Sequence, residues 1–154
     1  MARQNCFIKI SGDSIKPEVL EWIKELCRKF FVVVCVGGGT QINTAFEERG
    51  LPVGKHPTPL GRETNTLEER QLARDILELN QAKMQDMLAD LGVMITVIKP
   101  VLDLGTVLCH VNGDQLVLTA YLGFDILYIV TTPEREKQKA RDFAQYPKIK
   151  VVSF

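Results

Sequence analysis

The sequence has no excess of charge, no long apolar run and few histidines. Its 154 residues carry 19 Lys and Arg against 19 Asp and Glu, so the formal net charge at pH 7 is zero. A neutral chain has no global field to attract nucleic acid or an anionic membrane, so we expect neither partner. No apolar run reaches the roughly 18 residues of a membrane span, and the amino terminus lacks the apolar core of a signal peptide. We therefore expect a soluble, cytoplasmic protein.

The four cysteines form neither a CxxC pair nor a cluster with the two histidines. They are widely separated and lie in apolar surroundings: Cys6, Cys27, Cys35 and Cys109. This pattern predicts buried free thiols in a reducing compartment, and no metal site.

An apolar, β-branched run over residues 31–36 ends in three consecutive glycines, Gly37, Gly38 and Gly39. Such a run predicts a strand buried on both faces of a parallel sheet. The glycines let the backbone turn sharply and bring its amides close to an anion. Their spacing matches neither the dinucleotide fingerprint GxGxxG nor the phosphate loop GxxxxGK[ST]. A tight turn without a ligand is the alternative.

A second glycine turn, at Gly12, is expected beside the first. Residues 6–10 predict a strand, and a helix from Pro17 to about Phe30 leads to the glycine strand. In this β-α-β order both strands end at the same edge of the sheet. A helix starting near Thr40 would add its amino end, which favours phosphate or carboxylate.

Lys9 is unusual within a strand, because burying an unpaired lysine is costly. Its ammonium must reach a strand end or a ligand, and the anion site predicted at the two turns lies there. The alternative is a lysine at the sheet edge, in solvent.

Residues 50–65 are rich in proline and glycine, which excludes regular structure. His56 and Arg62 are candidates for ligand contact in this loop, or are ordinary surface residues.

Thr66 and Glu69 have the spacing of a capping box and begin a long helix that ends near Leu91. Asn80 on its apolar face needs a hydrogen-bond partner, from the backbone, a neighbouring chain or a functional group. The apolar surface of this helix, including Met84, Met87 and Leu91, favours a homo-oligomer, a dimer or higher.

Asp114 precedes a helical stretch over residues 115–122, and either caps that helix or faces the same crevice as Lys9. Strands are predicted over 93–98, 124–130 and 149–152, and a helix over 137–144. The alternation of strands and helices predicts an α/β fold, a three-layer αβα sandwich with a mainly parallel, Rossmann-like central sheet.

Three segments resemble, in order and approximate spacing, the amino-lobe signatures of the amino acid kinase superfamily, which includes uridylate, acetylglutamate and carbamate kinases. They are Lys9-Ile-Ser-Gly12-Asp13, Val36-Gly-Gly-Gly39 and Val111-Asn-Gly-Asp114-Gln. The first looks most like uridylate kinases, whereas the third and Gly61-Arg62-Glu-Thr are closer to acetylglutamate kinases. The resemblance implies phosphoryl transfer from ATP with Mg²⁺ to a small phosphate- or carboxylate-bearing acceptor, most of all UMP.

The resemblance also implies residue roles. Lys9 would stabilise the transferring phosphoryl group, and Asp114 would orient Lys9. Arg62 and Asn112 would bind the acceptor. Phosphate oxygens would be bound by the glycine turns, at Gly12, Gly37, Gly38 and Gly39. Relatives pair through the same lobe, which again implies an oligomer.

The chain also departs from these kinases. Thr131-Thr-Pro-Glu-Arg-Glu136 replaces their Asp-x-x-Gly turn, no second catalytic lysine can be placed, and His110 stands where acetylglutamate kinases carry asparagine. We expect one domain, residues 1–154, without most of the carboxy-terminal nucleotide lobe. Two alternatives to an enzyme follow: a non-catalytic module that binds small anions or regulates, and a Rossmann-like domain with a vestigial site.

Overall fold

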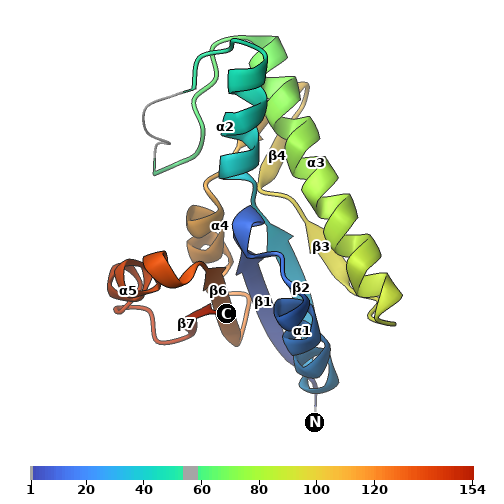
Figure 1. Ribbon diagram of the computed structural model, residues 1–154. Coiled ribbons are helices and arrows are strands. Elements are labelled where there is room, and N and C mark those ends of the chain that lie inside the picture. The colour runs from blue at the N-terminus through green and yellow to red at the C-terminus, as the bar shows by residue number, and fades with distance from the viewer. Residues whose placement is uncertain (1, 54–58) are drawn as a thin grey trace.

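The computed structural model describes residues 2–53 and 59–154. At its centre is a five-stranded sheet in the order β3-β2-β1-β6-β7, in which every recorded pairing is parallel (Figure 1). The predicted α/β fold with a mainly parallel sheet is therefore confirmed. The strands are β1 (Gln4–Ile10), β2 (Phe30–Val36), β3 (Thr96–Ile98), β6 (Ile126–Thr131) and β7 (Ile149–Ser153).

Helices cover both faces of the sheet. One core cluster joins Ile8 and Ile10 to α1 (Pro17–Lys29) and α3 (Leu67–Asp90). A second cluster, on the opposite face, joins Phe7 to α4 (Gly113–Ala120). Neighbouring residues of one strand thus face opposite layers, as the period of two requires. Among the described residues, no helix is long and apolar enough to cross a membrane.

The remaining helices begin at the carboxyl ends of strands. A short 3-10 helix, η1 (Gly12–Ser14), follows β1, and α2 (Gly39–Glu48) follows β2. The last helix, α5 (Pro133–Asp142), follows β6. The predicted helix over 137–144 therefore began four residues too late, although Pro133 occupies the favoured first position of a helix.

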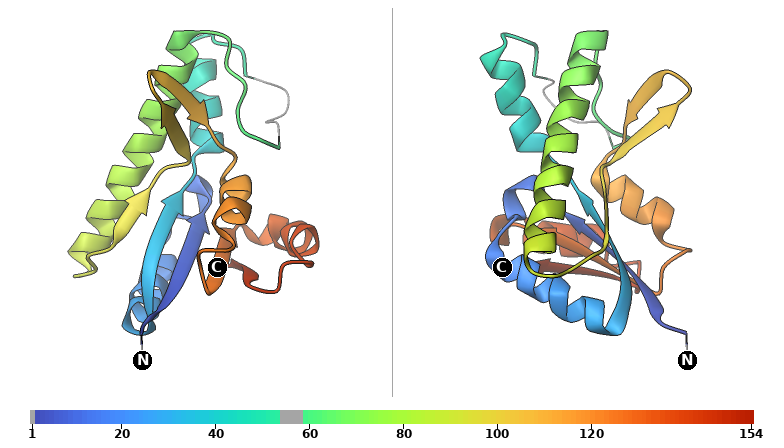
Figure 2. Two further views of the ribbon diagram at one scale, coloured as in Figure 1. Left: turned by 180° about the vertical axis from the view of Figure 1, so that it is seen from behind. Right: turned by 90° about the vertical axis from the view of Figure 1, so that its right-hand side faces the viewer.

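An antiparallel hairpin, β4 (Val101–Leu104) and β5 (Val107–His110), connects β3 to α4. The sequence pattern predicts no element in this segment. Gly105 adopts a φ of 65°, the left-handed conformation that two-residue hairpin turns favour. The hairpin projects past the carboxyl edge of the sheet beside α3 (Figure 2).

The capping box at the start of α3 is confirmed. Thr66 accepts from the Glu69 amide at 3.1 Å, and the Glu69 carboxylate accepts from the Thr66 amide at 3.3 Å. Met84 is fully buried, and Met87 and Leu91 pack against the core of the chain itself. Much of this apolar surface is thus covered by the chain itself, with Met87 and Leu91 only partly buried, and the oligomer stays a prediction.

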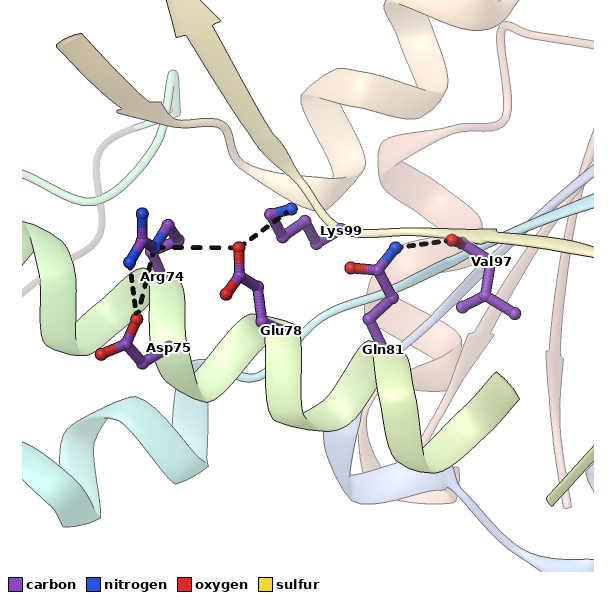
Figure 3. Close-up of polar contacts among 6 residues, drawn as sticks. All are labelled: Arg74, Asp75, Glu78, Gln81, Val97 and Lys99. Carbon is purple, nitrogen blue, oxygen red and sulfur yellow. Dashed lines mark hydrogen bonds and ion pairs between the residues drawn. The ribbon is translucent and has the colours of Figure 1, made fainter. Parts of the chain in front are cut away.

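The helix α3 also covers the free edge of the sheet. Gln81 donates to the Val97 carbonyl at 2.7 Å, and Gln85 donates to the Ile95 carbonyl at 2.9 Å. Glu78 forms an ion pair with Lys99 at 3.3 Å (Figure 3). These contacts satisfy edge carbonyls that would otherwise be open to another strand, and they fix α3 against β3.

Candidate functional site

A cavity of about 200 Å³ lies at the carboxyl edge of the sheet, where parallel α/β folds place their ligands. Its walls come from the β1–η1 turn, the β2–α2 turn, the segment around Arg62, the start of α4 and Arg135 of α5. Seven residues predicted from the sequence line it: Lys9, Gly12, Gly37, Gly38, Gly39, Arg62 and Asn112. Asp114 lies beside it, in contact with Lys9.

The two glycine turns meet, as predicted. The Gly37 amide donates to the Ile10 carbonyl at 2.8 Å. A Cβ on Gly12 would lie only 2.8 Å from the Gly37 carbonyl oxygen, so this close approach requires glycine. The Asp13 carboxylate joins the two turns through hydrogen bonds. It accepts from the Thr40 hydroxyl at 2.7 Å and from the side-chain amide of Gln41 at 3.0 Å.

The three consecutive glycines have different environments. A Cβ on Gly38 would lie 2.7 Å from Nδ2 of Asn80, whereas a Cβ on Gly39 would meet no atom within 4 Å. Gly38 is thus needed for packing against α3. Gly39 begins α2 in open space at the cavity, where amide groups of the first helical turn favour an anion.

Lys9 lies on β1, the central strand, with its side chain only 14% exposed. This excludes the alternative of an edge lysine in solvent. Its ammonium nitrogen is 3.3 Å from Oδ1 of Asp114. The aliphatic part crosses Gly113, where a Cβ would come within 2.6 Å of Cε of Lys9. Glycine at position 113 therefore leaves room for the lysine.

Lys139 of α5 also contacts Asp114, through Oδ2 of the carboxylate. Asp114 thus lies between two lysines that come from opposite ends of the chain. Burial opposes ionisation of this carboxyl group, but the charges of Lys9 and Lys139 outweigh it and lower its pKa. Asp114 is therefore ionised at neutral pH and attracts both ammonium groups.

Neither Lys139 nor Arg135 was predicted from the sequence; Arg135 lines the cavity one helical turn before Lys139. Residues four apart lie on the same face of a helix. The available signal was Pro133, two residues after the end of β6, which places the start of α5, and with it these two cations, at the carboxyl edge of the sheet.

The predicted capping role belongs to Asn112 and not to Asp114. Oδ1 of Asn112 accepts from the Asp114 amide at 2.9 Å, which makes Asn112 the N-cap of α4. This leaves the Asp114 side chain to the lysines. A contact between Asn112 and an acceptor would use the amide nitrogen of the side chain, because its oxygen caps the helix.

Arg62 lies across the start of α2. It donates to the Asn43 side-chain oxygen at 2.7 Å and to the Gly39 carbonyl at 3.3 Å, and its guanidinium lies 5.6 Å from the centre of the Phe46 ring. Burial lowers its pKa. Arg62 is therefore a cation whose position at the cavity wall is fixed by these contacts, and not an ordinary surface residue.

His110 also lines the cavity, and burial is the main reason that its pKa is lowered. The imidazole is therefore neutral at pH 7. The other candidate histidine, His56, lies outside the described residues.

Among residues 2–53 and 59–154, no group of three or more His, Cys, Asp and Glu side chains could hold a metal ion. Neither the models of known protein families nor the curated proteins include a match to this chain.

Proposed function

We propose that the chain is an amino acid kinase-like phosphotransferase, which transfers a phosphoryl group from ATP to a small phosphate- or carboxylate-bearing acceptor. One observation carries the proposal: Asp114 holds Lys9 and Lys139 together beside a cavity lined by glycine turns. The order and spacing of the three sequence signatures support the same class of enzyme.

The chemistry of phosphoryl transfer fits this arrangement, since catalysis there rests on positioning and on neutralising charge. Lys9 and Lys139 would neutralise the oxygens of the transferring group, and the glycine turns would bind them through backbone amides. Asp114 would keep the two ammonium groups in fixed positions. Mg²⁺ would arrive on the phosphates of ATP, as part of the donor substrate.

The size of the cavity bears on the acceptor. A volume of about 200 Å³ is below the roughly 300–1,000 Å³ of typical small-molecule sites, so it suits the anionic end of an acceptor. Arg62 and Asn112 would contact that group. UMP is the first acceptor to test, followed by carbamate and N-acetylglutamate.

A second candidate is a non-catalytic module that binds small anions. It is favoured by α5, which begins at Pro133, two residues after the end of β6, where the kinases carry an Asp-x-x-Gly turn. A charged helix thus occupies the segment that would begin the nucleotide lobe.

Titration calorimetry with Mg-ATP, combined with a transfer assay on the three acceptors, tests both candidates. Transfer that is lost in Lys9→Ala, and retained in the α5 surface control Lys137→Ala, would support the kinase. In an anion-binding module, Asp114→Asn would bind ATP more tightly, because a negative charge is removed, and no variant would transfer phosphate. Absence of ATP binding to the wild type would contradict the kinase proposal.

A further inference from the structure

Asn80 is a buried polar residue on the apolar face of α3, with 8% of its surface exposed. Its side-chain Nδ2 donates to the Gly37 carbonyl at 2.9 Å. The partner that sequence analysis required is therefore the glycine turn itself, 43 residues earlier in the chain. The contact joins α3 to the wall of the cavity.

This hydrogen bond fixes the orientation of one peptide unit. The Gly37 carbonyl and the Gly38 amide belong to the same plane, and in a trans peptide they point in opposite directions. The structure contains no cis peptide among its described residues. Because Asn80 holds the carbonyl toward α3, the Gly38 N–H points away from α3.

The Gly38 N–H is also left for a ligand. The Gly37 N–H is already used by the Ile10 carbonyl, but within the described part of the chain the Gly38 N–H donates to no other group. Gly38 lines the cavity. An unpaired amide at a cavity wall is the kind of donor that binds an anion.

We propose that Asn80 is a positioning residue, which orients the Gly37–Gly38 peptide so that the Gly38 N–H binds an anionic oxygen in the cavity. The proposal rests on the anion site of the proposed function and adds the residue that fixes one of its donors. It also explains the glycine at position 38, since a Cβ there would collide with Nδ2 of Asn80 and displace it.

The test is Asn80→Asp, with sulfate as the probe because its charge is constant between pH 5 and pH 8. At pH 8 the new carboxylate has no proton to donate and repels the Gly37 carbonyl, so the peptide loses its anchor. When protonated at lower pH, the carboxyl group donates to that carbonyl, and the peptide regains its anchor. Burial raises the pKa of such a carboxyl group, so its protonation moves from more acidic pH toward pH 5.

Calorimetry should show sulfate binding by Asn80→Asp roughly tenfold or more weaker than wild type at pH 8, since a hydrogen bond to a charged group is lost. The ratio of the two sulfate affinities, wild type to Asn80→Asp, should return toward one at pH 5. Gln81→Glu is the matched control, because it makes the same amide-to-acid change on the same helix, at a residue whose wild-type side chain donates to the Val97 carbonyl at 2.7 Å, away from the turn. It should bind sulfate like the wild type at both pH values.

A second measurement does not depend on the folding of any variant. In a ¹⁵N-labelled wild type, sulfate should shift the Gly38 amide resonance at saturation. Equal sulfate affinity of Asn80→Asp and wild type at both pH values, or an unmoved Gly38 amide beside other shifted amides, would overturn the inference and leave the proposed function intact. If the wild type binds neither sulfate nor Mg-ATP, the proposed function itself fails.

Discussion

Gly113→Ala is expected to separate stability from ligand binding. The added Cβ would lie 2.6 Å from Cε of Lys9, and the ordinary contact distance begins at 3.4 Å, so Cε must move by about 0.8 Å. The atom that moves is near the free end of a flexible side chain. The backbone of α4 can therefore stay in place while the ammonium group leaves its position beside Asp114.

The magnitudes follow from the distances. At an effective dielectric constant of about 20, lengthening the 3.3 Å ion pair of Lys9 and Asp114 by about 0.8 Å weakens their attraction by about 1 kcal/mol. Alanine is favoured over glycine by up to about 1 kcal/mol in a helix interior, so at Gly113, the first residue of α4, it offsets only part of this loss. An anion, however, loses a charged hydrogen bond worth about 1.5–3 kcal/mol, which is a roughly 10- to 150-fold weaker affinity.

The assay combines urea unfolding with calorimetric titration of sulfate and Mg-ATP. Gly123→Ala is the control, because a Cβ there would lie 3.7 Å from the Ala120 carbonyl, an ordinary contact. Gly113→Ala should unfold within about 1 kcal/mol of the wild type and bind anions at least about tenfold more weakly. Wild-type affinity in this variant would refute the proposed role of Lys9, and a loss of several kcal/mol in stability would refute the steric reasoning.

Three further predictions concern the fold. Burial raises the pKa of the Cys6 and Cys35 thiols to about 12, so iodoacetamide at pH 8 should modify both only after unfolding, as mass spectrometry would reveal. His110 has a lowered pKa when folded, so its contribution to stability is present above pH ~6.5 and is lost as the pH falls; His110→Gln should lose less stability than the wild type between pH 7 and pH 5 in urea titrations. Thr66→Ala removes the cap of α3 and should cost about 1 kcal/mol by the same method, whereas an unchanged midpoint would show that Glu69 alone is sufficient.

The sequence predicted those parts of the site that depend on local pattern. Largely apolar strands followed by glycine identify the carboxyl ends of a parallel sheet, and chain order places Gly12 beside Gly37. Lys9 was predicted as a site residue because a lysine is unusual among the apolar residues of such a strand. The structure then showed that β1 is the central strand, which excludes the alternative that Lys9 lies at the sheet edge in solvent.

The rest of the site could not be predicted, because it depends on packing between distant segments. Lys139 lies on α5, whose many charges give no reason to select one lysine, and its partner Asp114 is 25 residues away. The hydrogen-bond partner of Asn80 could not be predicted from the sequence either. The need for a hydrogen bond was evident from the apolar face of α3, but the carbonyl that meets it depends on how α3 packs against the glycine turn.

Asp114 bears on the choice between an enzyme and a module that only binds anions. Four cations, Lys9, Arg62, Arg135 and Lys139, lie in or beside the cavity. A carboxylate between two of them cancels part of their attraction for an anion, which weakens simple binding. The same carboxylate is an advantage where the ammonium groups must hold fixed positions as charge develops in a transition state, because only interactions that strengthen there accelerate a reaction. The partly buried contacts of Asp114 with both lysines therefore support the proposed phosphoryl transfer over anion binding alone.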